Sequence, residues 1–292
     1  MSPILNHQLV RSRLFAKTGA AMVLAICILG AGEAVLAQQQ TPKNVNRQER
    51  PDQNRLRMAQ DYERLGNYVG ALRIFQNLFA EVPGNQLYYE GVKRNLIRLK
   101  RFEELLAIIQ DQMAEKPDVK FLADMGDVHY KQGLPDQAEA AWNDALARFG
   151  QQQASYTYIA NAMIMNRLYD QATEVYLKGR AHFNQPALFV FELANIYVIR
   201  LKYGEATREY LRHLESNPNQ FSYIESRIIN YTVEPEDART VAEILENLLP
   251  ESKQKYLVRK LLADLYLRIE AFAKAIEQFK MLETMEPPVA LQ

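Results

Sequence analysis

The sequence predicts an all-α protein, a right-handed α-solenoid of about seven helix-turn-helix units. Two observations predict this fold. A pattern of small, aromatic and apolar residues recurs with a period of about 34 residues along most of the chain. In addition, 48% of the residues are hydrophobic, yet no stretch alternates between apolar and polar residues as a half-buried strand would.

The clearest unit spans about residues 187–221. Small residues at two fixed positions let two antiparallel helices approach, and apolar and aromatic residues fill the seam between them. A proline near the end of the unit stops its second helix. The residues at these positions are Leu193, Ala194, Tyr197, Tyr203, Ala206, Tyr210 and Pro218.

Seven such units can be placed end to end from residue 52 to residue 292 as one elongated domain. Their approximate ranges are 52–85, 86–118, 119–152, 153–186, 187–221, 222–255 and 256–289. Gly66 and Gly133 stand at the turn between the two helices, where a positive φ suits glycine. Leu105 replaces the small residue of the second unit, so we expect its helices to be spread slightly apart, and Val241 replaces it in the sixth.

This pattern resembles the tetratricopeptide repeat, over about four fifths of the chain. The resemblance implies a scaffold that holds other proteins in a concave groove. Some members of the family grip a C-terminal carboxylate with a Lys and an Asn on the first helix. Asn161 and Asn195 match that Asn, but Thr157 and Phe191 stand in place of the Lys. This departure argues against that type of recognition and leaves the capture of an extended or helical segment open.

The first 37 residues have the pattern of a secretory signal peptide of the bacterial type. Arg11, Arg13 and Lys17 precede an apolar run, and cleavage is expected before Gln38. A flexible polar leader, residues 38–51, is expected to follow. We therefore expect an exported protein of the periplasm or cell envelope. An uncleaved anchor is the alternative, and contact with a membrane is expected only through this segment.

Charge and motifs argue against several other classes of function. Lys and Arg number 35, as do Asp and Glu, so nothing in the net charge favours nucleic acid or an anionic membrane. The chain has no cysteine pair and no phosphate-binding or nucleophile motif, and packing explains His129 first. We therefore expect no catalytic residue, no cofactor and no metal, and interpret the protein as non-enzymatic.

Three features suggest a partner groove on the first helices. Polar residues recur at one position of successive units, where stacking would align them: Asp127, Asn161, Asn195, Asn230 and Asp264. Ordinary repeat consensus is the stronger explanation, because Asn is common at this position of such repeats. Tyr158 and Phe191 are expected to face the groove, although neighbouring repeats could cover them. A basic run in the second unit could meet an acidic partner or form a solvated face; it contains Lys93, Arg94, Arg98, Lys100 and Arg101.

These features predict a scaffold for protein–protein interaction that captures a peptide or helical segment of its partner. Envelope assembly, secretion and polysaccharide export are the settings that the resemblance suggests. Two alternatives stay open: a groove that binds carbohydrate or peptidoglycan by stacking on tyrosines, and an accessory domain of a longer enzyme. No polar capping helix follows the seventh unit, so we also expect that a partner, a second copy or further chain covers its end.

Overall fold

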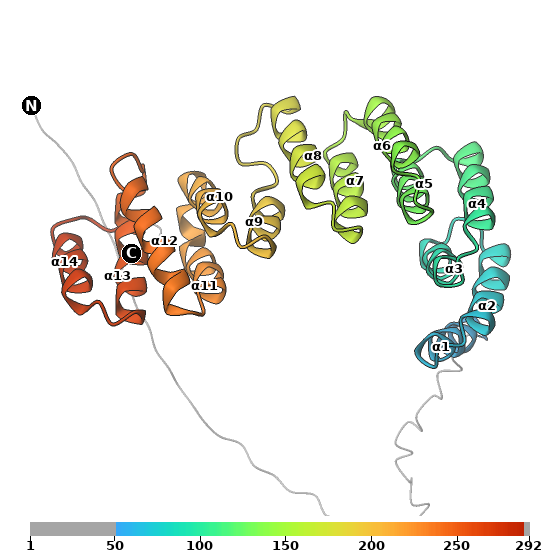
Figure 1. Ribbon diagram of the computed structural model, residues 1–292, viewed down its shortest axis with the longest axis horizontal. Helices are drawn as coiled ribbons and strands as arrows, with labels where there is room; N and C mark the ends of the chain where they lie inside the picture. The colour runs from blue at the N-terminus through green and yellow to red at the C-terminus, as the bar shows by residue number, and fades with distance from the viewer. Residues whose placement is uncertain (1–50, 289–292) are drawn as a thin grey trace, which may run out of the picture. The chain divides into compact units, whose positions relative to one another are not determined.

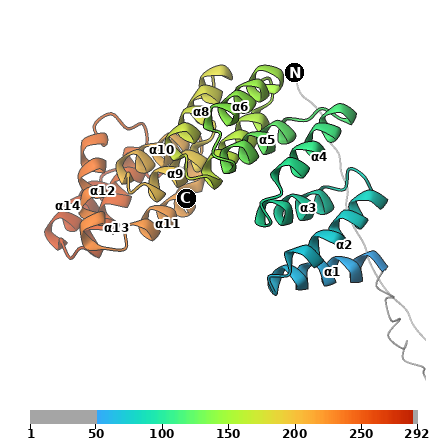
Figure 2. The ribbon, with the colours of Figure 1, turned by 45° about the vertical axis from the view of Figure 1, so that its right-hand side comes forward.

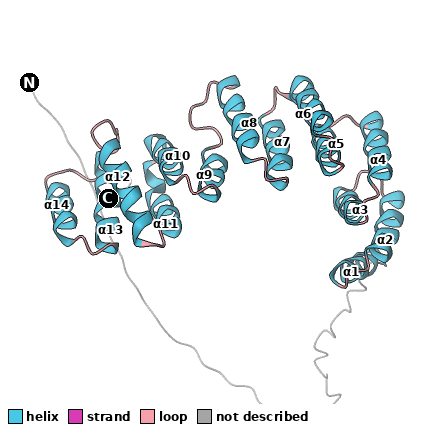
Figure 3. Cartoon of the chain, in the orientation of Figure 1, coloured by secondary structure: helices cyan, strands magenta, loops and turns pink. Residues whose placement is uncertain are grey.

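The computed structural model describes residues 51–288, which fold into paired antiparallel helices (Figure 1). Fourteen α-helices and one short 3-10 helix, η1, follow one another in this part of the chain. Figure 2 gives a second view, and Figure 3 shows that loops and turns join the helices. The bounds are α1 (Pro51–Arg64), α2 (Tyr68–Glu81), α3 (Gln86–Arg98), α4 (Phe102–Glu115), α5 (Val119–Lys131), α6 (Pro135–Phe149), α7 (Gln153–Met165), α8 (Tyr169–His182), α9 (Val190–Ile199), α10 (Tyr203–Ser216), η1 (Pro218–Gln220), α11 (Phe221–Tyr231), α12 (Pro235–Leu248), α13 (Lys255–Arg268) and α14 (Phe272–Glu283).

This architecture confirms the predicted all-α repeat fold. Each of the seven expected units contains two helices, the first odd-numbered and the second even-numbered. The signal peptide and most of the polar leader lie outside the described residues, so their predictions are untested. Within residues 51–288, no helix is both long enough and apolar enough to span a bilayer.

Local sequence signals explain where several helices begin. The Asn67 side chain caps α2 by accepting a hydrogen bond from the backbone N–H of Gly70 at 3.0 Å. Asp118 caps α5 in the same way through the N–H of Lys120, at 3.0 Å. Pro135 opens α6, where a missing N–H costs nothing.

In six of the seven units the turn between the two helices has a left-handed residue, as the two glycines predicted for their own units. Gly66 and Gly133 have φ values of 75° and 80°. Four other units place a residue with a side chain in the same conformation, with φ between 56° and 61°: Lys100, Arg167, Leu201 and Glu270. A residue with a Cβ atom is strained there, so these four turns store a small conformational cost.

The size of one residue in the second helix controls how closely the paired backbones approach. Five units have alanine there, fully buried, and their two helices run close together: Ala71, Ala138, Ala172, Ala206 and Ala275. The pair α3 and α4, with Leu105, and the pair α11 and α12, with Val241, approach much less. The expected spreading of the second unit is therefore present, because the larger side chain occupies the seam.

Buried side chains form three clusters that succeed one another along the chain. The first covers residues 59–128, the second residues 119–196 and the third residues 194–275. Each cluster crosses the boundary between consecutive units. The units are thus held by packing against their neighbours, which keeps the first helices in order for a binding surface.

Candidate functional site

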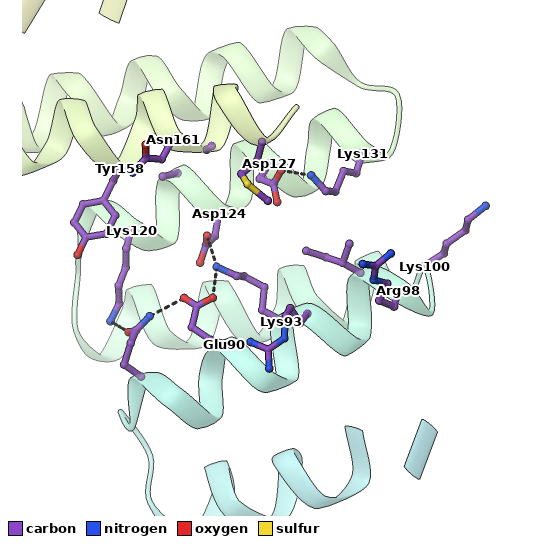
Figure 4. Close-up of a pocket in the computed structure, with 16 residues that line it drawn as sticks. Glu90, Lys93, Arg98, Lys100, Lys120, Asp124, Asp127, Lys131, Tyr158 and Asn161 are labelled. Atoms are coloured by element: carbon purple, nitrogen blue, oxygen red, sulfur yellow. Dashed lines mark hydrogen bonds and ion pairs between the residues drawn. The ribbon is translucent and has the colours of Figure 1, made fainter. Parts of the chain in front are cut away.

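A cleft of about 800 Å³ lies over the first helices α3, α5 and α7 (Figure 4). The backbones of α5 and α7 pack closely, whereas those of α3 and α5 approach each other little. Side chains therefore fill the space between the second and third units only in part. The residues that line the cleft include Glu90, Lys93, Arg94, Ile97, Arg98, Lys100, Lys120, Asp124, Asp127, Lys131, Tyr158, Asn161 and Met165.

A buried polar group joins α3 to α5 in the middle of the cleft. The Tyr89 hydroxyl donates a hydrogen bond to Oδ2 of Asp124 at 2.7 Å, and Nζ of Lys93 lies 2.9 Å from Oδ1. Lys93 also pairs with Glu90 at 2.7 Å. The Tyr89 ring packs edge-on against Phe121, with centroids 5.3 Å apart. The middle of the cleft thus holds one ammonium group between two carboxylates and is rigidly supported.

Burial governs how these groups ionise. It raises the pKa of Asp124 above its ordinary value, although Lys93 and the Tyr89 hydroxyl act in the opposite direction. Burial also raises the pKa of Tyr89, and the charge of Asp124 adds to this effect. Burial alone would lower the pKa of Lys93, but the charges of Asp124 and Glu90 raise it overall.

A second polar group lies farther along α5. Lys131 pairs with Asp127 and donates a hydrogen bond to Oδ1 of Asn166 at 2.8 Å. Nδ2 of Asn166 donates to Oδ1 of Asp127 at 2.6 Å. Asp127 is therefore neutralised within the chain and joins the third unit to the fourth.

Three of the cationic side chains in the cleft have no carboxylate partner within residues 51–288: Arg98, Lys100 and Lys120. Arg94 differs, since it pairs with Glu63 at 3.0 Å. Lys120 lies over the Phe121 ring, 4.7 Å from its centroid, and donates a hydrogen bond to Gln86. The cleft therefore has a surplus of positive charge after its internal ion pairs are counted.

Helix α7 contributes one exposed stripe of mixed character. The exposed fraction is 47% for Tyr158 and 78% for Met165. Asn161 lies between them on the same helical face and is exposed, and its side-chain amide makes no hydrogen bond to another described residue. This face can offer apolar contact together with a free donor and acceptor.

The structure distributes the seven groove residues predicted from the sequence over several places. Asp127, Tyr158 and Asn161 line the cleft. Asn195 and Asn230 line a separate hollow of about 210 Å³. In that hollow, the Asn195 side-chain oxygen accepts a hydrogen bond from Arg227 of the next unit.

The other two predicted residues are engaged within the chain. Asp264 pairs with Lys260 at 3.0 Å, and Lys260 also pairs with Glu225 of the preceding unit at 2.6 Å. The half-buried Phe191 ring packs against His213, with centroids 4.7 Å apart. Several ladder positions thus bind neighbouring units, and contact of all seven with a partner stays a prediction.

Sequence reasoning missed part of the cleft. The basic run pointed to Lys93, Arg94, Arg98 and Lys100, which all line it, whereas Arg101 pairs with Glu104 instead. Lys120, Asp124 and Lys131 were not singled out. Their only signal is one helical face of α5, at spacings of four and seven residues, which is common on any solvated helix.

Within residues 51–288, no three or more His, Cys, Asp or Glu side chains are grouped to hold a metal ion. The paired antiparallel helices define the class of helical-repeat solenoids. Its hairpins have the tetratricopeptide-repeat fold, with Leu193, Ala194, Ala206 and Tyr210 buried where that pattern requires.

Among known families, curated proteins and solved structures, only solved structures resemble the chain. No protein-family model and no curated protein matches the chain. Among solved structures, a tetratricopeptide-repeat protein from Parabacteroides merdae is 15% identical, with 82% of this chain and 95% of that chain covered and a TM-score of 0.34. A thermophilic repeat protein from Thermus thermophilus is 18% identical, with 63% and 100% covered and a TM-score of 0.38. The C-terminal part of a repeat protein from Cytophaga hutchinsonii is 16% identical, with 81% and 98% covered and a TM-score of 0.36. Nothing about function follows from similarities of this size.

Proposed function

We propose that the chain is a non-enzymatic scaffold that holds a segment of a partner protein in the cleft over α3, α5 and α7. The observation that carries the proposal is the composition of this cleft. It combines unpaired cations with the exposed Tyr158 and Met165 and with the free amide of Asn161. An apolar surface of this kind on an ordered helix favours contact with another molecule.

The proposed mechanism is reversible capture. The Asn161 amide can donate to a backbone carbonyl and accept from a backbone N–H, so it suits an extended polypeptide. The hydrogen-bonded groups at Asp124 and Asp127 hold the first helices in place before the partner arrives. Because these helices are already held in place, less conformational entropy is lost on binding, which favours affinity.

Export is the second part of the proposal. The signal pattern before Gln38 supports a mature protein in the periplasm or cell envelope, where it would serve envelope assembly, secretion or polysaccharide export. Fractionation of producing cells and N-terminal sequencing test this part. A mature chain that begins at Gln38 is expected, and a cytoplasmic chain that retains Met1 would contradict export.

A crosslinking pull-down tests the scaffold itself. The mature 38–292 segment is exported in its own cells, crosslinked and analysed by mass spectrometry. Asn161→Ala is expected to lose a discrete set of envelope proteins. Asn77→Ala, at an exposed asparagine of α2 outside the cleft, is the matched control and is expected to keep them. Recovery of glycan fragments in place of proteins would favour a groove that binds carbohydrate.

Self-association through the last unit is part of the same proposal. One position of the second helix is buried in each of the first six units: Phe75, Ile109, Trp142, Tyr176, Tyr210 and Leu245. The equivalent Phe279 is 38% exposed, and Ile276 beside it is also exposed. By contrast, α1 presents Arg55, ion-paired to Asp52 and Glu81.

The apolar α14 face therefore fits the α14 face of a second copy better than it fits α1. Sedimentation of the 38–292 segment is expected to give a dimer that Phe279→Glu dissociates. A wild-type monomer at all concentrations, or a dimer that resists this substitution, would contradict this part.

A further inference from the structure

We infer that the occupant of the α3–α5–α7 cleft is an acidic, extended segment of a partner protein, with two carboxylates that flank an apolar side chain. This inference rests on the proposed scaffold function and specifies the chemistry of its partner. It follows from three observations on the cleft: the position of its unpaired charges, its length and the side chains of α7.

The unpaired charges lie toward both ends of the cleft (Figure 4). Lys120 stands at the start of α5, beside Tyr158 of α7. Arg98, the last residue of α3, and Lys100, in the turn that follows, stand at the other end of the cleft, on the same side as Lys131. The middle is occupied by Lys93, which Asp124 and Glu90 already neutralise. Two separated anionic groups therefore fit better than one central anion.

The distance between the two ends sets the length of the segment. Lys131, itself paired with Asp127, marks the end of α5 on the side where Arg98 and Lys100 lie. It is eleven residues from Lys120, which corresponds to about 16 Å at about 1.5 Å per residue. An extended chain covers about 3.4 Å per residue, so the two carboxylates belong roughly five residues apart. Lysine and arginine side chains are long and flexible, which allows a difference of about one residue.

The side chains of α7 specify what lies between the carboxylates. Tyr158 and Met165 expose apolar surface toward the cleft, and Ile97 of α3 lies on its opposite side. An apolar residue in the middle of the segment would cover this surface. The amide of Asn161, between Tyr158 and Met165, can then bond the backbone of the same segment.

These features favour a polypeptide over other polyanions. A single-stranded nucleic acid needs successive aromatic side chains on which its bases stack, and among residues 51–288 Tyr158 is the only aromatic residue that lines the cleft. An anionic polysaccharide could satisfy the cations, but it has no side chain to cover Met165 and Ile97. The experiment must therefore distinguish binding of an anionic polysaccharide from binding of a protein segment.

The test is a binding titration with labelled synthetic peptides and the 38–292 segment. The probe peptide has about a dozen residues, with two glutamates roughly five residues apart and a leucine between them. The comparison peptide has glutamines in place of both glutamates. We expect the wild-type protein to bind the acidic peptide at least about tenfold more tightly than the glutamine peptide, and added salt to narrow this difference.

Two variants locate the binding. Arg98→Ala/Lys100→Ala is expected to weaken binding of the acidic peptide about tenfold, because it removes two exposed cations at one end of the cleft. Arg73→Ala/Lys178→Ala is the matched control. It removes the same charge from exposed residues of α2 and α8 that form no ion pair within residues 51–288, and it is expected to bind as the wild type does. Met165→Glu tests the apolar contact and is expected to weaken binding of both peptides.

Several results would overturn the inference. These are equal affinity for the two peptides, no measurable binding of the acidic peptide, and equal weakening by the control pair. Binding of an oligogalacturonate that is as tight as peptide binding, and equally sensitive to Arg98→Ala/Lys100→Ala, would replace the protein segment by an acidic sugar. If the peptides fail while Asn161-dependent envelope proteins are still captured in cells, the scaffold function stands and only the acidic chemistry is wrong. If both fail, the scaffold function fails as well.

Discussion

Lys93 of the second unit and Asp124 of the third are joined across the cleft, with 2.9 Å between Nζ and Oδ1. The pair is largely shielded from solvent, and the Tyr89 hydroxyl completes the hydrogen bonding of the carboxylate. A contact of this kind fixes the distance between α3 and α5, whose backbones otherwise approach little. The cleft thus depends on a group that is costly to bury.

The pH dependence of stability tests this cost. Because burial raises the pKa of Asp124, its neutral form is favoured in the folded state. The stability that it contributes is therefore complete below its ordinary value of 3.8 and is lost as the pH rises through the raised pKa. We expect the wild type to lose unfolding free energy relative to Asp124→Asn as the pH rises from 3.8 toward neutrality.

Urea denaturation at a series of pH values measures this difference. Asp111→Asn, at an exposed carboxyl of α4, is the control, because it removes one negative charge without changing a buried group. A wild type that gains stability relative to Asp124→Asn with rising pH would mean that the attraction of Lys93 outweighs burial.

The turns within the units offer a test of backbone strain. Leu201 is exposed and has a φ of 56°. Leu201→Gly is expected to raise the free energy of unfolding by about 1 kcal/mol, because glycine adopts this conformation without strain. Leu177→Gly, at an exposed position inside α8, should lower it by about 1 kcal/mol. Destabilisation by both changes, measured in thermal melts, would contradict the role given to the turn.

The seam between paired helices predicts a strong steric effect. Ala206 is fully buried where α9 and α10 approach closely. Ala206→Trp is expected to lower the stability by about 3 kcal/mol or more, because the backbones would have to separate. Ala275→Trp should act in the same way in the last unit. An unchanged circular-dichroism melt would show that the repeat register is wrong, and Ala147→Trp on the exposed side of α6 is the control.

The single tryptophan reports on a close contact in the third unit. Nε1 of Trp142 donates a hydrogen bond to the backbone oxygen of Ala123 at 3.1 Å. A Cβ atom on Gly126 would lie 2.2 Å from Nε1, so Gly126→Ala must displace the indole. We expect a red-shifted fluorescence maximum and a loss of about 2 kcal/mol. An unshifted spectrum with unchanged stability would contradict this packing.

The repeat architecture could be predicted from the sequence because the residues that determine each hairpin lie within one unit. Small residues such as Ala206 and a turn residue such as Gly66 act within one unit, so their spacing alone predicts the hairpin. The connection from α8 to α9 was not predictable in the same way. There Phe189 has a φ of 60°, and Arg180 forms a buried ion pair with Glu209 at 2.6 Å.

The candidate site was predictable only in part. Tyr158, Asn161 and the basic run were found because they occupy recognisable positions of a unit. The cleft itself depends on how far α3 stands from α5, which is a relation between units. Such a relation is set by long side chains such as Lys93 that pair across the boundary, and these pairs leave no pattern in a single sequence.

Site-specific photocrosslinking in living cells tests the central claim most directly. A photoreactive amino acid is placed at Met165 in the cleft and, as a control, at the exposed Leu177 of α8, on a second helix. We expect discrete crosslinks to envelope proteins from position 165, reduced by Arg98→Ala/Lys100→Ala, and none of these from position 177. The same products from both positions, or none from position 165, would contradict a protein-binding cleft on α3, α5 and α7.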